Sequence, residues 1–593
     1  MRRGLAVFIL YTVFFGALFL QFPLKNSLPG NCDSWLLISL SNQYLLKIDE
    51  LVTGERYGRA MYPIENLHAY GESTPGCCAM FLLLKLFGLS DLWTYYLYLT
   101  AIFALTAFAV YRFATLFMPG RAGPIFAGFA FTCSNMAFAH IDDSIIYFYA
   151  LPLTAAYLLV RHLRERRGRY LWAAAAVGGL EVYFSLYVFI YQTLLLAAIL
   201  LYQRLKKEPL PSLREAAAAL ALYGGLAIPY FLFYLFVVTR LHVIDPFGLL
   251  YTARMTSLMP FDFIAALPEN PIYGGLVDLP QNWGFVRHRN LIGLLVTALG
   301  VYGLLRWNRD RRLFLLIAAF GFVFALGPNL MYHPQAEFLP PAPLYPFYTW
   351  IPVLSYMRVT NRAYFLVLLA LSLCAGLSLD RLVRLLIGKK RAAAYAVIAA
   401  VFIVHGVENI PIPFKAWPVA RYIELPDDYA RFVATTAPNE VFMDLPSHFN
   451  MQVENWDPAV FDDPLRFIRR EPGQPRLEVS EISMFTSSWD NLFQYNRELI
   501  YMQWQSLHRR STVSGLNGYF PTPRMLYYQH GERLPEPEAV GWLARRGVTA
   551  IVYHKGMELK KDRVGLSMLE GSPLLEKVFD SPTLAAFRFR RSQ

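Results

Sequence analysis

The chain has 593 residues, of which 55% are hydrophobic and only 17% are charged, whereas soluble proteins usually carry about a quarter charged residues. Its net charge of +12 is divided among short Lys/Arg clusters between long apolar runs, which is typical of cytoplasmic loops and not of a nucleic-acid surface. Composition therefore excludes a soluble globular protein, indicates no nucleic-acid partner and predicts a multi-pass α-helical membrane protein.

The apolar stretch from Leu5 to Phe22 follows Arg2 and Arg3 and lacks a small-x-small cleavage site. We therefore expect an uncleaved first helix with a cytoplasmic N-terminus. Further apolar runs bring the total to about eleven spans. They cover residues 92–116, 125–139, 145–160, 170–182, 184–202, 216–238, 291–305, 313–326, 363–379 and 392–407. The dense Lys/Arg clusters follow even-numbered spans, which all end in the cytoplasm if the first begins there.

The long connecting segments, 23–91, 239–290 and 327–362, then fall outside, so we expect the protein to work at the external face. Pro411, Pro413 and Pro418 indicate a linker between a membrane domain (1–409) and an external soluble domain (410–593). The pattern of the latter predicts a small α/β domain. Helices are expected at 429–435 and 539–546, strands at 441–445 and 548–554, and a hairpin at 575–579 and 584–589.

Asp33 is the first candidate for chemistry, because it opens the first external loop just after the first span. It could cap the helix that begins at Trp35, or act as a general base on an acceptor hydroxyl. In the same loop Cys32 could pair with Cys77 or Cys78, and sequence alone does not decide between a disulfide and free thiols.

His140, Asp142 and Asp143 lie together between the third and fourth spans. Adjacent carboxylates beside a histidine could bind a divalent cation, but such carboxylates also cap helices in ordinary loops. No second acidic cluster has ligand spacing, so no metal site is assigned and a divalent cation stays a possible cofactor.

Three further charged residues lie at the external ends of spans. Glu181 ends the fifth span, where a carboxylate usually faces a cavity or a partner. Arg358 and Arg362 precede the tenth span four residues apart, on one face of the expected helix start. Arginines there could bind a phosphate, or anchor the protein to headgroups of membrane lipids.

Several stretches share the layout of a known family. They are Asn31-Cys32-Asp33-Ser34, His140 with Leu151-Pro152-Leu153, Tyr183-Phe184-Ser185-Leu186-Tyr187, the run from Pro352 to Arg362, and, in the soluble part, His508-Arg509-Arg510 and Gly515-Leu516-Asn517-Gly518-Tyr519. With them the chain resembles the GT-C superfamily of polytopic membrane glycosyltransferases, in particular bacterial members with a C-terminal extracytoplasmic domain.

The resemblance implies a sugar donor linked to polyprenyl phosphate, a glycan, lipid or protein acceptor, and inverting transfer outside a bacterial inner membrane. Asp33 would match the acceptor-activating base, and Arg358 and Arg362 would stabilise the leaving phosphate. The chain departs from the family's paired acidic signature, because Asp33 has no acidic neighbour; Asp142 and Asp143 are candidates for the second carboxylate.

Two other classes stay open on the residues alone. One is a lipid or glycan transporter or flippase, although no internal repeat is evident and the charges gather at the outer face. The other is a non-catalytic assembly protein of the cell envelope, in which the soluble domain would do the work.

Overall fold

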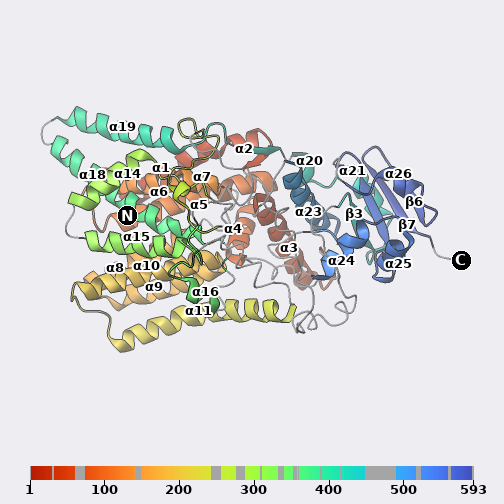
Figure 1. The fold of residues 1–593 in the computed structure, drawn as a ribbon, viewed down its shortest axis with the longest axis horizontal. Helices are drawn as coiled ribbons and strands as arrows, with labels where there is room; N and C mark the ends of the chain where they lie inside the picture. The colour runs from red at the N-terminus through yellow and green to blue at the C-terminus, as the bar shows by residue number, and fades with distance from the viewer. Residues whose placement is uncertain are drawn as a thin grey trace. The chain divides into compact units, whose positions relative to one another are not determined.

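The chain divides into two compact units (Figure 1). One contains Met1–Phe22, Tyr96–Phe231 and Asp245–Lys415, and the other contains Pro23–Tyr95, Leu232–Ile244 and Ala416–Gln593. The computed structural model describes residues 2–29, 33–60, 74–141, 148–241, 256–275, 288–306, 310–331, 340–350, 357, 359–387, 390–414, 416–418, 420–447, 489–515, 522–558 and 562–590.

The first unit is helical, and a helix lies at each position where the hydropathy pattern predicts a span. They are α1 (Arg2–Phe19), α5 (Asp91–Ala114), α6 (Ala122–Thr132) with α7 (Asn135–Ala139), α8 (Ala150–Glu165), α9 (Gly168–Leu180), α10 (Leu186–Leu205), α11 (Leu213–Leu241), α14 (Leu294–Arg306), α15 (Arg311–Ala325), α18 (Phe365–Ile387) and α19 (Arg391–Asn409). Helices α5 and α11 also contribute residues to the second unit.

Among the described residues, seven helical segments are long and apolar enough to cross a membrane, so the protein is a multi-pass membrane protein. Helices α8, α9, α14 and α15 have only 16, 13, 13 and 15 residues. At 1.5 Å per residue they are about 20–24 Å long, shorter than a hydrocarbon core of about 30 Å. The crossing of these four stays a prediction.

Helix α18 forms the centre of the first unit, where it packs against α6, α14, α15 and α19. Its contact with α6 depends on glycines, because a Cβ on Gly123 would lie 2.4 Å from the carbonyl oxygen of Gly376. Small residues permit this close approach of two membrane helices, whose association depends on packing because lipid is as apolar as the side chains.

The second unit contains a five-stranded sheet in the order β4-β3-β5-β7-β6. Strands β4 (Ser511–Thr512), β3 (Val441–Leu445) and β5 (Ala550–His554) are parallel, and β7 (Leu584–Phe589) is antiparallel to both β5 and β6 (Leu575–Asp580). Helices α21 (Asp427–Ala434) and α25 (Pro537–Arg545) lie at the predicted positions. The expected strands, hairpin and helices are therefore confirmed.

Segment 23–91, the predicted first external loop, shares this unit with the C-terminal segment, Ala416–Gln593. Strand β1 (Ser27–Pro29) pairs antiparallel with β2 (Ala416–Pro418). Helix α3 (Asp33–Thr53) packs against α4 (Pro75–Lys85) and against α23 (Trp489–His508) of the C-terminal segment. The compact unit therefore extends beyond the predicted soluble domain and includes most of segment 23–91.

The cysteines of this loop lie in α4. Both Cys77 and Cys78 are buried there, and Cys78 is a free thiol, which excludes Cys78 as a disulfide partner. Cys32 lies outside the described residues, so a bond from Cys32 to Cys77 stays a prediction.

Candidate functional site

Asp33 is the first residue of α3, two residues before the predicted helix start. A carboxylate at this end of a helix is favoured by the helix dipole. The next residues are firmly held: the Ser34 hydroxyl donates to the Pro29 carbonyl at 3.0 Å and lies 2.8 Å from the Tyr95 hydroxyl, and Trp35 is fully buried. The Asp33 side chain itself is not described, so the choice between cap and base stays open.

Arg362 lies in the first unit, in the 3-10 turn η4 (Asn361–Tyr364) that leads directly into α18. Its side chain is buried, and its guanidinium lies 5.2 Å from the ring centroid of Tyr187 on α10. One turn further along α10, the Tyr191 hydroxyl donates to the Val359 carbonyl at 3.1 Å. Two stretches that are far apart in sequence, 187–191 and 359–362, are therefore brought together.

The turn that carries Arg362 is also fixed from a third segment, residues 256–267. The Asn361 backbone N–H donates to the Thr256 carbonyl at 3.1 Å. In this segment Asp262, on turn η3 (Pro260–Phe263), accepts from the Met259 N–H at 2.7 Å and contacts His288 at 2.9 Å. Burial raises the pKa of Asp262 above its ordinary value, while His288 opposes this shift.

In the sequence, His288 and Arg289 stand out only as neighbouring basic residues shortly before the predicted span 291–305, and Asp262 does not stand out. Arg289 is buried and donates to the Ala266 carbonyl at 2.9 Å, and its own carbonyl accepts from Asn135 of α7 at 2.8 Å. Arg289 therefore connects α7 with the segment 256–267. Nothing local in the sequence marks Asp262, because its role depends on a partner 26 residues away.

Glu181 and His140 are both buried in the first unit. Glu181 begins the turn η2 (Glu181–Tyr183), and its carbonyl accepts from the Ser185 N–H at 2.9 Å. Ser185 in turn caps α10 through the Val188 N–H, so the turn of Glu181 positions the helix that carries Tyr187. His140 caps the C-terminus of α7. Asp142, Asp143 and Arg358 lie outside the described residues.

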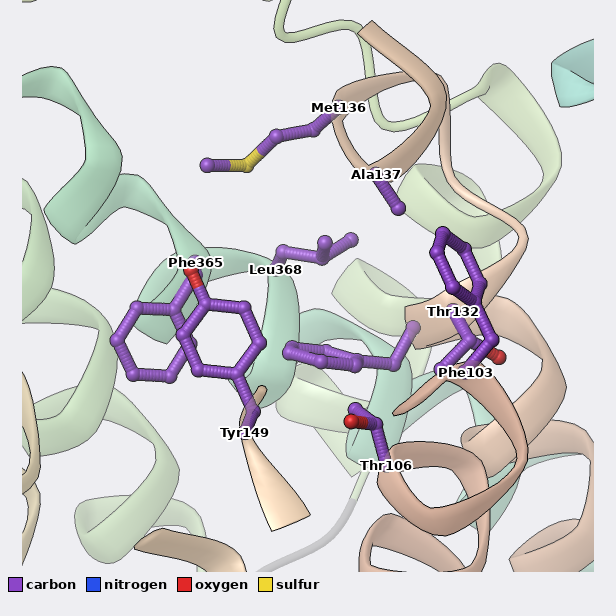
Figure 2. A pocket seen from close by; sticks show the side chains of 9 residues that line it. Phe103, Thr106, Thr132, Met136, Ala137, Tyr149, Phe365 and Leu368 are labelled. Atoms are coloured by element: carbon purple, nitrogen blue, oxygen red, sulfur yellow. The ribbon is translucent and has the colours of Figure 1, made fainter. Parts of the chain in front are cut away.

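A small cavity lies in the first unit beside the N-terminal end of α18 (Figure 2). Tyr149 stacks on Phe365 at 4.3 Å, and Phe103, Met136 and Leu368 form other walls. The cavity offers about 20 Å³, which is room for about one water molecule. A sugar or a phosphate group does not fit there, so this cavity is not a substrate site.

A larger apolar groove of about 440 Å³ runs between α1, α6 and α19. Its lining includes Phe14, Phe129, Phe402 and Gly406, and its one hydroxyl, on Tyr11, is bonded to the Ile125 carbonyl at 2.7 Å. A groove of this lining suits a hydrocarbon chain and not a sugar.

No group of three or more His, Cys, Asp or Glu side chains in the described ranges is arranged to hold a metal ion. Since Asp142 and Asp143 lie outside those ranges, a divalent cation at these residues stays a prediction.

No protein-family model and no curated protein sequence matches the chain. Among solved structures, the chain is similar to the arabinofuranosyltransferase AftD from Mycobacteria, with a TM-score of 0.51 and 13% identity over 98% of this chain. The fold is GT-C-like. This confirms the expected fold class, and the chain spans 41% of the length of that enzyme.

Two structures of ArnT from Cupriavidus metallidurans are also similar, each at 13% identity and covering 98% of this chain and 97% of the other. The structure bound to undecaprenyl phosphate gives a TM-score of 0.47, and the apo structure gives 0.45.

Proposed function

We propose that this protein is an inverting glycosyltransferase that moves a sugar from a polyprenyl-phosphate donor to an acceptor at the external membrane face. The observation that carries the proposal is the fold shared with an arabinofuranosyltransferase over 98% of the chain. The proposal places the protein in a bacterial inner membrane, with its N-terminus in the cytoplasm and its C-terminal segment outside.

In the proposed reaction, the Asp33 carboxylate takes the proton of an acceptor hydroxyl. The acceptor oxygen attacks the anomeric carbon on the face opposite to the phosphate, which inverts the configuration of that carbon. The bond between the anomeric carbon and the phosphate oxygen breaks, and the polyprenyl phosphate leaves with the electron pair.

Arg362 is suited to the leaving group, because its planar guanidinium can donate two parallel hydrogen bonds to phosphate oxygens. It is 3% exposed, and a charge that water does not screen interacts more strongly with developing negative charge. Support also comes from its position at the start of α18, where the helix dipole favours an anion.

The donor's hydrocarbon tail would occupy the apolar groove between α1, α6 and α19. Tyr11 presents no unsatisfied hydroxyl there, because it is bonded to Ile125, so a chain without polar groups meets no buried polar atom that needs a partner.

The test is a transfer assay with purified protein in nanodiscs. The donors are synthetic polyprenyl phosphates that each carry one radiolabelled sugar, arabinofuranose among them, and the acceptor is a membrane glycan extract. We expect labelled product with inverted anomeric configuration and its loss in Asp33→Asn, which keeps the size of the side chain and removes the base. Full activity of Asp33→Asn at normal abundance would remove Asp33 from the mechanism.

A further inference from the structure

Helices α3 and α23 meet through polar side chains on one face of α3. Ser39, Asn42 and Gln43 are spaced by three and four residues, so they lie on the same face. Ser39 donates to the Leu499 carbonyl at 3.3 Å, and Asn42 donates to the Gln503 side chain at 3.0 Å. The contacts advance together along both helices, so the two helices run parallel.

A second pair continues this register, because Gln43 donates to the Gln505 side chain at 2.6 Å. Gln503 and Gln505 are fully buried. The Gln505 amide also donates to the Gly58 carbonyl at 2.8 Å. Buried amides of this kind find their partners at one register only, whereas apolar side chains pack acceptably at several.

Charged residues complete the network around Asn42. The Asp91 carboxylate accepts from both Asn42, at 3.0 Å, and Gln503, at 3.1 Å. Lys85 pairs with Asp91 at 2.7 Å and donates to the side-chain oxygen Oδ1 of Asn42 at 2.7 Å. A shift of α3 along α23 would therefore leave a buried carboxylate without several of its partners, which is costly.

The chain after α3 makes a separate backbone contact with the C-terminal segment. The Gly58 N–H donates to the Arg509 carbonyl at 2.7 Å, and the Thr512 N–H of β4 donates to the Arg59 carbonyl at 2.8 Å. A Cβ on Gly58 would lie 2.1 Å from the backbone of Arg510 and Ser511. Only glycine fits at this position, because the obstacle is backbone that cannot swing aside.

We infer that the C-terminal segment positions Asp33, by holding α3 in register through α23 and β4. This inference rests on the proposed function, in which Asp33 is the base. Ser39 lies six residues after Asp33 in the same helix, a rise of about 9 Å, so a displacement of α3 at its contacts with α23 displaces Asp33 as well. Gln503 and Gly58 are then positioning residues for the transfer reaction.

The experiment replaces the contacts one at a time in the full chain in nanodiscs. Gln503→Leu and Asn42→Leu remove the same contact from its two sides, and Gly58→Ala disturbs the separate backbone contact. For each variant, hydrogen exchange of the α3 amides is measured, together with kcat and the donor KM with a radiolabelled polyprenyl-phosphate sugar, per folded enzyme.

We expect faster exchange in α3, kcat lower by about 10- to 100-fold because a small misplacement of a catalytic group has effects of that size, and a donor KM that stays within about twofold. The double variant at Asn42 and Gln503 should lose less activity than the two single losses combined, since the two residues bond to each other and share Asp91 as a partner.

The matched control is Tyr528→Phe on α24 (Thr522–Gly531), which removes a hydrogen bond to Glu498 of α23 inside the C-terminal segment. It should leave kcat and α3 exchange unchanged. If α3 exchanges faster in Gln503→Leu at an unchanged kcat, or if its exchange does not change at all, the inference fails while the proposed function stands. If Asp33→Asn keeps full activity, Asp33 is not the base, and the proposed mechanism itself fails.

Discussion

Replacement of Arg362 tests how the protein stabilises the leaving phosphate. Arg362→Gln keeps much of the side-chain volume and removes the charge, whereas Arg362→Lys keeps the charge and loses the planar fork and its stacking on Tyr187, 5.2 Å away. A hydrogen-bond donor that stabilises charge developing in the transition state lowers the activation free energy by about 2.7–4 kcal/mol when water is excluded.

The burial of Arg362, at 3% exposure, places it within this range, because no water can take over its role. Each 1.36 kcal/mol corresponds to a tenfold change in rate. We therefore expect kcat to fall about 100- to 1,000-fold in Arg362→Gln and about tenfold in Arg362→Lys.

The measurement is single-turnover transfer from a labelled polyprenyl-phosphate sugar, with the folded fraction determined by thermal unfolding of each variant. Tyr187→Phe is the control, since it keeps the aromatic ring beneath the guanidinium and should leave the rate within about twofold. Activity of Arg362→Gln within about threefold of the unmodified protein would refute the role of Arg362 at the leaving group.

Two further predictions concern stability and the groove. Burial lowers the pKa of His508 to about 4, and its Nδ1 accepts from the Arg510 N–H at 3.0 Å. The unfolded chain binds this proton near pH 6.5, so His508 should cost the second unit up to about 3 kcal/mol as pH falls from about 6.5 to 4. In urea unfolding at pH 7.5 and 4.5, His508→Asn, which keeps an acceptor and does not titrate, should lose less stability than the unmodified protein; an equal loss would contradict this assignment. Gly406→Phe should obstruct the groove and raise the KM for the sugar donor about tenfold at constant kcat. Gly406→Ala is the control and should leave this KM unchanged, because its Cβ would contact Ile410 at an ordinary 3.6 Å. An unchanged KM in Gly406→Phe would exclude the groove as the path of the lipid tail.

The helices and their order were predictable because an apolar run marks a helix by its own composition. All the predicted spans coincide with helices, and the strands Val441–Leu445 and Leu584–Phe589 were found at the expected residues. Alternation and hydropathy are local properties, so they need no knowledge of partners. Whether a short helix crosses the membrane was harder to predict. With 13 residues, α9 is shorter than the hydrocarbon core, so its crossing depends on the surrounding structure.

The candidate site could be predicted only residue by residue. The sequence singled out Asp33, Glu181 and Arg362 by their positions at the ends of spans, but it did not show that Arg362 would lie over Tyr187. Asp262 was not predicted at all, because a lone aspartate in a long loop looks like any solvated residue until its partner His288 is known.

By itself, the sequence determined that this is a multi-pass membrane protein with a small α/β domain, since both follow from hydrophobic periodicity. Only the tertiary structure decided that α3 belongs with α23, through the bond from Asn42 to Gln503 across 461 residues. The physical reason is that the identity of a polar residue does not specify its hydrogen-bond partner. The same amide side chain can bond to water in a loop or lie buried in a hydrogen-bonded network, and only the folded structure distinguishes the two cases.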